Sequence, residues 1–573
     1  MRHWGIATGV ALGAALGLSL GLVNWPLDPS RVRRDLGVVI GPIEAPALAT
    51  LRLLPRPTLQ LTDLRFGGAG AAVTAEAADA QVSLSLPHLL IGDFEPLGLT
   101  LRGAEIKLDL DAAERALANL HRPPIARLMV DSASVAVVSV RRKLNTRLDI
   151  ATARLDWASA GSGLRASATG RWRGQPVEAT LDLDEPLAAV HGDPTPVRAA
   201  LDAPLGQWRF AGDWSPRGRL DGANYRGQVS ALIPSLSRFA RWIGQPPPGP
   251  APAGLELAGR FSASAAEAKL SDAVLTLGGQ RFEGDLAAMK SPAGVSVSGT
   301  MAADALDLDA LIGPPPTLID DDDGWSKTPA LPAPSQGLDL DLRLSASRAV
   351  WRGHAIEDAA AAVSQRDGRF AVKLLDAAYA HGALSGEMSI QNGQAACESK
   401  LALSLENADL GALLAEFGER NFTGEGSLKL TIKAHGRSPA EIVASADGEG
   451  SLEIADGALR HLNFEEALRR GQRRLIDVAR DMNAGATRFG AAHGRIEVSN
   501  GEARFVDVAT QSPGVSLAVS GAVDLAGRAW RAEVSARQSS DDGKPTPDGA
   551  HMDFALYGPW SGPVLAPILP PAD

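Results

Sequence analysis

The chain has 573 residues, of which 45% are hydrophobic and 21% are charged, a balance typical of a folded protein. Its net charge of -11 provides no broad positive field for a polyanion, which argues against nucleic-acid binding. The single cysteine, Cys397, excludes an intramolecular disulfide and a cysteine-rich zinc site.

An uncharged run at the N-terminus, residues 5–23, has about the ~20 apolar residues that cross a bilayer as a helix. A cleaved signal peptide is the alternative, but its apolar part is usually only ~7–15 residues long. The basic residues Arg31, Arg33 and Arg34 follow the run and oppose export, although long domains are translocated largely regardless of charge. We therefore expect an uncleaved transmembrane anchor within residues 1–29, made by Ile6, Val10, Leu12, Leu16, Leu18, Leu20, Leu22 and Val23.

Residues 27–37 predict a short helix, with a proline near its start and Gly37 after its end. Beyond it, apolar and polar residues alternate, which predicts strands with one apolar and one polar face. Three such runs lie in residues 80–110 and comprise Val82, Leu84 and Leu86, then Leu97, Leu99 and Leu101, then Ile106, Leu108 and Leu110. Later runs contain Leu338, Leu340, Leu342 and Leu344, then Leu428, Leu430 and Ile432, then Val515, Leu517 and Val519.

Short turns join most of these runs, so we expect about 25 to 30 strands in antiparallel meanders. Weakly repeated short helices are expected within residues 230–248, 303–316 and 405–418. A longer amphipathic helix is expected over 463–482, with Asn463 and Glu466 as a capping box. Its apolar face comprises Phe464, Leu468, Leu475, Val478 and Met482. This helix either plugs the end of a sheet or binds a partner.

Sequence patterns of catalysis and metal binding fail in context. The serine-hydrolase pattern at residues 17–21 lies inside the apolar run, without the strand and helix it needs. A calcium loop with Gly324 as its sixth residue would have Ala330 where a glutamate ligand is required. The ten histidines include no HExxH pair. We therefore expect no enzyme activity, no metal and no cofactor.

Charged residues between and along the strands also have simple interpretations. Asp339 and Asp341 alternate with leucines, which predicts the polar face of a strand. The basic triplet 141–143 predicts a turn rather than a phosphate site. Cys397 is expected to be an inert side chain.

Several segments of the chain resemble the AsmA family. The N-terminal segments are residues 56–68 and 80–110, and the C-terminal segments are residues 424–468, 487–530 and 556–567. The C-terminal part has a Ser-x-x-Glu-Ile segment, a Gly-x-Gly strand, a helix, a Thr-x-Phe strand and a closing Gly-Pro-Trp-Ser. The tryptophan-containing loop near residue 325 is also similar. Residues 36–48 depart from the family, because they replace a tight Thr-Gly-Arg element.

The resemblance implies a protein of a Gram-negative bacterium that is anchored in the inner membrane and lies mostly in the periplasm. It also implies repeated β units curled into a long groove with an aliphatic lining. Relatives of this class are implicated in phospholipid movement between membranes and in outer-membrane biogenesis. About 25 strands at ~4.8 Å spacing would make a groove of ~120 Å.

The expected fold class is mainly β: an N-terminal transmembrane helix, then a long, curled, mostly antiparallel β-sheet groove of repeated units with a few short capping helices. The expected segments are the anchor at 1–29, an N-terminal β region at 30–245, a middle β repeat at 246–336 and a C-terminal β region at 337–573. The alternating residues named above, from Val82 to Val519 but without Leu338, are the candidate groove lining, and ordinary core packing is the alternative for each.

Two functions remain open. The first is a lipid conduit that binds phospholipid acyl chains and the inner membrane. An outer-membrane or periplasmic protein at the far end is the further partner expected. The second is a non-enzymatic periplasmic scaffold that assists assembly of outer-membrane proteins, for example by pairing its sheet edge with a partner.

Overall fold

The computed structural model of the chain describes most residues beyond the N-terminal run. The ranges are 22–68, 70–91, 94–117, 125–216, 223–245, 253–291, 294–312, 317–320, 324–329, 337–393, 397–416, 421–471, 485–540, 542–547, 549–560 and 562–568. The predicted anchor residues Ile6, Val10, Leu12, Leu16, Leu18 and Leu20 lie outside these ranges, whereas Leu22 and Val23 are described and exposed. Among the described residues, no helix has both the length and the apolar character that crossing a bilayer requires.

The chain divides into two compact units, each built on a β-sheet. Unit 1 comprises residues 1–248 and 253–279, and unit 2 comprises 249–252 and 280–573. The predicted mainly β class with a few short helices is therefore confirmed for the described residues. The four segments predicted from the sequence remain a prediction.

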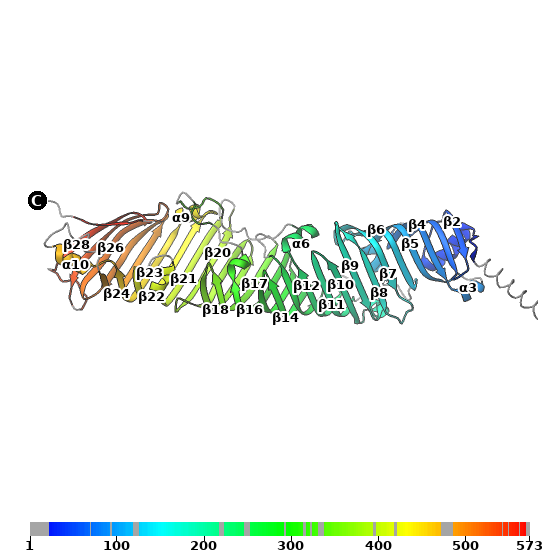
Figure 1. Cartoon of the computed structure of the whole chain (residues 1–573), viewed down its shortest axis with the longest axis horizontal. Helices are drawn as coiled ribbons and strands as arrows, with labels where there is room; N and C mark the ends of the chain where they lie inside the picture. Colours follow the sequence, from blue (N-terminus) through cyan, green and yellow to red (C-terminus); the bar gives the residue numbers. More distant parts are fainter. Residues whose placement is uncertain are drawn as a thin grey trace, which may run out of the picture. The chain divides into compact units, whose positions relative to one another are not determined.

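In unit 1 the strands lie side by side in chain order (Figure 1). They are β1 (Trp25–Pro26), β2 (Leu48–Arg52), β3 (Thr58–Phe66), β4 (Val73–Leu84), β5 (Pro96–Asp109), β6 (Arg127–Ser139), β7 (Leu144–Asp156), β8 (Leu164–Trp172), β9 (Gln175–Leu183), β10 (Thr195–Ala203), β11 (Gly206–Ser215), β12 (Asn224–Ile233), β13 (Leu255–Ala263) and β14 (Glu267–Leu277). The helices are α2 (Pro29–Ile40), α3 (Leu86–Leu90), α4 (Leu110–Leu117), α5 (Pro186–His191) and α6 (Leu236–Ile243).

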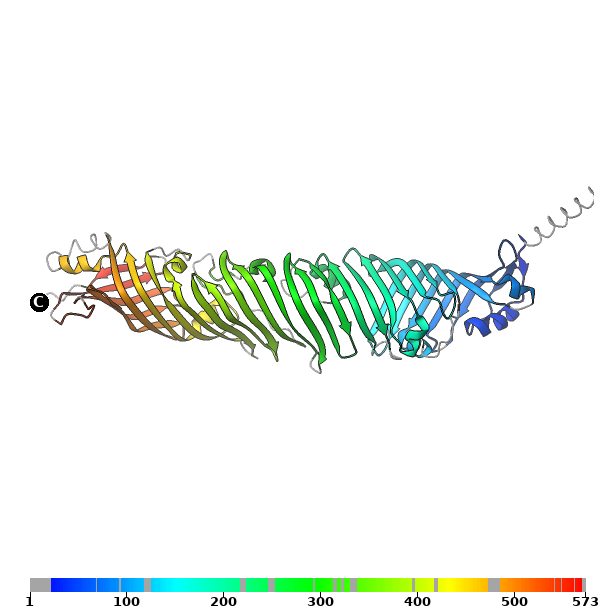
Figure 2. The same ribbon diagram turned by 90° about the horizontal axis from the view of Figure 1, so that it is seen from below.

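Unit 2 repeats this plan, again with neighbouring strands in chain order (Figure 2). Its strands are β15 (Gln280–Ser291), β16 (Gly294–Asp307), β17 (Leu338–Trp351), β18 (His354–Arg366), β19 (Arg369–Tyr379), β20 (Gly382–Asn392), β21 (Cys397–Asp409), β22 (Phe422–His435), β23 (Asp447–Arg460), β24 (Ala486–Ser499), β25 (Glu502–Gln511), β26 (Gly514–Asp524), β27 (Ala529–Ser539), β28 (His551–Pro559) and β29 (Val564–Pro567). Its helices are α7 (Leu308–Ile312), α8 (Leu410–Glu416), α9 (Pro439–Ala444) and α10 (Phe464–Gly471).

Most strand pairs are antiparallel, as predicted. Among the strand pairs that the structure describes, β5–β6 and β16–β17 are parallel. A parallel pair needs a connection that carries the chain back to the starting edge of the sheet. The helices α4 and α7 begin these two connections, because each follows the first strand of its pair directly.

The start of α2 agrees with the prediction, but its end does not. The Asp28 side chain accepts a hydrogen bond from the Ser30 amide, and Pro29 opens the helix. Gly37 does not end the helix, which continues to Ile40 and stops at Gly41, a residue with φ of +100°. A glycine inside a helix costs only about 1 kcal/mol, which packing of the helix can offset.

The helix α10 begins where the sequence places it. The Asn463 side chain accepts a hydrogen bond from the Glu466 amide, and Phe464 and Leu468 are buried. The helix is described only as far as Gly471, so Leu475, Val478 and Met482 lie outside the described residues. Its contacts with β24, β26, β27 and β28 agree with a helix that covers the end of a sheet.

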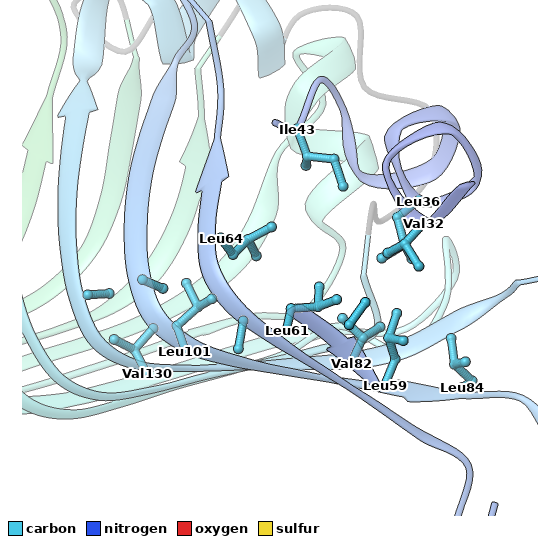
Figure 3. Close-up of a cluster of buried hydrophobic side chains, with 14 of the residues drawn as sticks. Val32, Leu36, Ile43, Leu59, Leu61, Leu64, Val82, Leu84, Leu101 and Val130 are labelled. Atoms are coloured by element: carbon cyan, nitrogen blue, oxygen red, sulfur yellow. The ribbon is translucent and has the colours of Figure 1, made fainter. Parts of the chain in front are cut away.

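The first core of unit 1 lies between α2 and the sheet. Figure 3 shows Val32 and Leu36 of α2 facing Leu59, Leu61 and the neighbouring strand residues. Leu36, Leu59 and Leu61 are completely buried. This helix therefore closes the apolar face of the first strands.

An irregular row of residues, which we call the kink row, crosses strands β3 to β7. The residues before and after this row pair with the neighbouring strands in one continuous register. The residues of the row itself form no regular pair with the neighbouring strand. Three of its residues have left-handed backbones: Asp63 (φ 55°), Gly103 (φ 58°) and Ser132 (φ 57°). The others are Ala78 and Ala151. Residues of a regular strand share a face when they are an even number of positions apart. Across the kink row, apolar residues three positions apart share a face, as Leu61 and Leu64 do in the same core.

Candidate functional site

The apolar face of unit 1 continues beyond α2 as a row of directly paired residues. From β7 to β14 the partners are Ala153, Ala168, Ala179, Leu201, Trp208, Ala231, Leu257 and Leu275. A second row contains Leu155, Ala166, Leu181, Ala199, Phe210, Val229 and Gly259. Most of these residues are half-buried, and Leu181 is 38% exposed.

The opposite face of the same strands is polar. It contains ion pairs such as Arg154 with Asp156 at 2.6 Å and Arg209 with Asp202 at 3.2 Å. All four of these side chains keep about a third or more of their surface exposed. Exposed ion pairs contribute little to stability but keep this face hydrated. The sheet therefore has the two chemically different faces that the alternation predicts.

Unit 2 has the longer apolar row, which we call the central row. From β15 to β28 it comprises Leu286, Gly299, Leu342, Val363, Val372, Met388, Leu401, Ile432, Gly448, Val498, Ala503, Val523, Trp530 and Gly558. The residues that adjoin the central row along each strand lie on the opposite face of the sheet. They include Arg343, Lys373, Glu387 and Glu449.

The central row is open in its middle and closed toward its C-terminal end. Met388 is 40% exposed and Leu401 is 38% exposed, although both are large apolar side chains. Val498 and Val523 are buried in a core to which Trp530 adds its ring. Burial at one end and exposure in the middle mean that the chain covers this face only in part.

Short helices make the covered stretches. Over β8 and β11, α6 places Trp242 against Trp172 and Phe239 against Trp208, with ring centroids 4.8 Å and 5.2 Å apart. The indole of Trp242 also donates a hydrogen bond to the Trp172 carbonyl. In unit 2, α8 adds Leu410 to the core around Leu405. The helices thus close parts of the apolar face and leave other parts half-exposed.

The predicted lining residues have three different environments. Val82, Leu84, Leu101, Val515 and Leu517 are buried, so they belong to cores that the chain itself closes. Half-buried positions are Leu99, Ile106, Leu108, Leu340, Leu342, Leu344, Leu428, Leu430, Ile432 and Val519. Of these, Leu342 and Ile432 lie in the central row.

Three predicted lining residues are not part of a regular strand ladder. Leu86 begins α3 and Leu110 begins α4, so the expected strand alternation is wrong at both positions. Local capping explains the second case, because the Asp109 side chain accepts hydrogen bonds from the amides of Asp111 and Ala112. Leu97 lies at the register shift where β4 meets β5 and is 48% exposed.

The rows of unit 1 between β7 and β14 are not among the residues predicted from the sequence. Their leucines are interspersed with alanine, glycine and single aromatic side chains, which give a weaker apolar alternation than consecutive leucines do. The signal was nevertheless present in residues 164–172, where Leu, Ala, Ala, Gly and Trp occupy every second position.

The basic triplet forms a turn, as predicted, and its arginines pair within the protein. Arg141 and Arg142 both contact Glu114, and the Arg141 side chain donates to Asp111 at 3.1 Å. The Ser139 hydroxyl donates to Asp111 at 2.8 Å, and this bond is the largest cause that lowers the pKa of Asp111 to about 2. This cluster joins α4 to the turn after β6. The lone Cys397 is buried and lies 3.3 Å from the Asn392 side-chain oxygen.

Residues 320–508 match the sequence model of the AsmA family. This region, which is less than half of the chain, is similar to the AsmA family. The AsmA region includes the open middle of the central row, with Met388 and Leu401. The comparisons with curated proteins and with solved structures give no match.

Proposed function

We propose that this AsmA-like protein is anchored in the inner membrane, lies in the periplasm and holds phospholipid acyl chains against its apolar face. In this role it serves phospholipid transport to the outer membrane and outer-membrane biogenesis. The observation that carries the proposal is the open middle of the central row, where apolar residues are paired from strand to strand and partly exposed. The N-terminal run of residues 5–23 supports the anchor.

An acyl chain lowers its free energy by covering apolar protein surface that would otherwise be exposed to water. Burial of each methylene contributes about 0.8 kcal/mol, so even partial contact along a row would hold a lipid tail. The row offers similar side chains on every strand at ~4.8 Å intervals, which gives many sites of similar affinity. Similar sites permit movement along the row, whereas one deep pocket would retain the lipid.

Site-specific photo-crosslinking tests this proposal in the full-length chain. Benzoylphenylalanine replaces Leu401 on the apolar face or Ala402, its exposed neighbour on the polar face. The chain is expressed in a Gram-negative bacterium with phosphate-labelled phospholipids. We expect a phospholipid adduct at position 401 and a much weaker one at position 402. Equal labelling at both positions, or none at either, contradicts lipid binding to this face.

The scaffold function is the second candidate and uses the same experiment. An exposed apolar row also suits a protein segment, and the outer edge of β29 can accept a further strand. Protein adducts at position 401 without phospholipid would favour the scaffold. Phospholipid adducts without a protein partner would favour the conduit.

A further inference from the structure

The helix α3 exposes an apolar surface at the start of unit 1. Leu86 is 47% exposed, and Leu90 and Ile91 are each 79% exposed. Leu97, which begins the return of the chain into β5, is 48% exposed. Leu89, by contrast, packs against the core beneath α2, and the His88 ring contacts Ser85 and Glu95, while Leu86 and Leu90 remain exposed.

The pairing register places α3 at the edge of the sheet where the predicted anchor leads into unit 1. Trp25 of β1 pairs with Leu51, and Leu51 pairs with Leu59. Leu59 pairs with Val82, which is followed within four residues by α3. Three strand spacings of ~4.8 Å separate β1 from β4, a lateral distance of ~14 Å. Val23, which precedes β1, and the helix α3 therefore lie at the same ends of these strands, close together.

The side chains at this edge have the composition of a bilayer interface. Trp25 is 43% exposed, and tryptophan is enriched at the level of lipid headgroups. Arg52 and Arg56, in the connection from β2 to β3, are exposed, and their charges favour anionic headgroups. The nearby carboxylate of Glu95 lies 2.6 Å from the His88 ring and therefore has a partner within the protein.

We propose that α3 inserts into the surface of the bilayer that the predicted anchor crosses. Leu86, Leu90 and Ile91 enter the boundary between headgroups and acyl chains, with Leu97 beside them, and Trp25 lies at the headgroup level. The N-terminal end of unit 1 then sits against the lipid rather than standing off on a linker. This inference rests on the proposed membrane anchor, but it does not require lipid on the central row.

A fluorescent label at position 90 tests the insertion in the full-length chain. Cys397→Ser removes the native thiol, and Leu90→Cys carries a nitrobenzoxadiazole label. The matched control is Val140→Cys, because Val140 is 83% exposed and apolar. Val140 follows the end of β6, which runs parallel to β5. It therefore lies at the ends of the strands opposite to those that carry α3. The labelled proteins are reconstituted into vesicles of phosphatidylethanolamine and phosphatidylglycerol, with or without bromine on the acyl chains.

We expect the label at position 90 to emit at shorter wavelength in vesicles and to lose fluorescence to brominated acyl chains, while the label at position 140 does neither. A label at Ile91→Cys should behave like position 90. Water-like emission without quenching at both 90 and 91 overturns the proposal, as does equal quenching at position 140. If position 90 is quenched while Leu401 gives no phospholipid adduct, the insertion stands and only the lipid-conduit function fails.

Discussion

The partial cover of the apolar face predicts that two leucines on one strand differ in their contribution to stability. Leu401 and Leu405 lie on the same face of β21 and are four residues apart. Leu401 is paired with Met388 and Ile432 in the central row, whereas Leu405 is 2% exposed in the core beside α8. The two leucines thus share a strand and a face, and they differ in how far other side chains bury them.

Replacement by alanine removes three carbons, with a transfer free energy of about 2.4 kcal/mol for a fully buried leucine. Leu401 keeps 38% of its surface exposed, so Leu401→Ala should lower the free energy of unfolding by about 1.5 kcal/mol. Leu405→Ala adds a cavity and should cost about 3 to 4 kcal/mol. Urea unfolding of the full chain, followed by tryptophan fluorescence, measures both. Equal losses, or a larger loss at position 401, would refute the view that the row is open.

Four further changes follow from single contacts. Leu401→Asp should abolish copurification of phospholipid, measured by mass spectrometry of organic extracts, while Ala402→Asp should not; retention in both variants would contradict the proposed site. Since its pKa of about 2 lies below the ordinary 3.8, Asp111 adds stability above pH ~4 that is lost as the pH falls through ~2. Asp111→Asn should flatten the dependence of the urea midpoint on pH in this window, and an unchanged slope would count against it. Trp325→Phe should cost about 1 kcal/mol, read from the urea midpoint, because the indole donates to the Leu525 carbonyl at 2.8 Å. Gly212→Ala should lower the melting temperature, since a Cβ would lie 2.2 Å from the Arg226 oxygen; an unchanged value would show that β11 and β12 can separate.

Periodicity predicts strands well in this chain because most of the sheet has one apolar and one polar face. Leu340, Leu342 and Leu344 illustrate the success, since all three lie half-buried on one face of β17. The prediction is wrong where local chemistry overrides alternation. Pro87 lies at the start of α3, and Asp109 caps α4, so Leu86 and Leu110 leave the strands although the numerical spacing continues.

The extent of cover could not be predicted from alternation. Leu84 and Leu342 have the same pattern of neighbours in the sequence, but only Leu84 belongs to the core closed by α2. The difference arises from which helix packs over which strand, a long-range property that a period of two residues does not contain. The spacing of three between Leu61 and Leu64 or between Leu101 and Ala104 did hold information, because it marks the kink row.

The kink row bears on how accurately this sheet can form. Rows of leucine, alanine and glycine would pack almost equally well if one strand slipped past its neighbour by two residues, since the same face would remain inward. Asp63, Gly103 and Ser132 oppose such a slip because their left-handed backbones fit only beside the irregular positions of the adjacent strands. A displaced strand would set a left-handed residue against a regular ladder and lose hydrogen bonds there. The irregular positions thus raise the free energy of folding intermediates in which one strand is paired in a shifted register.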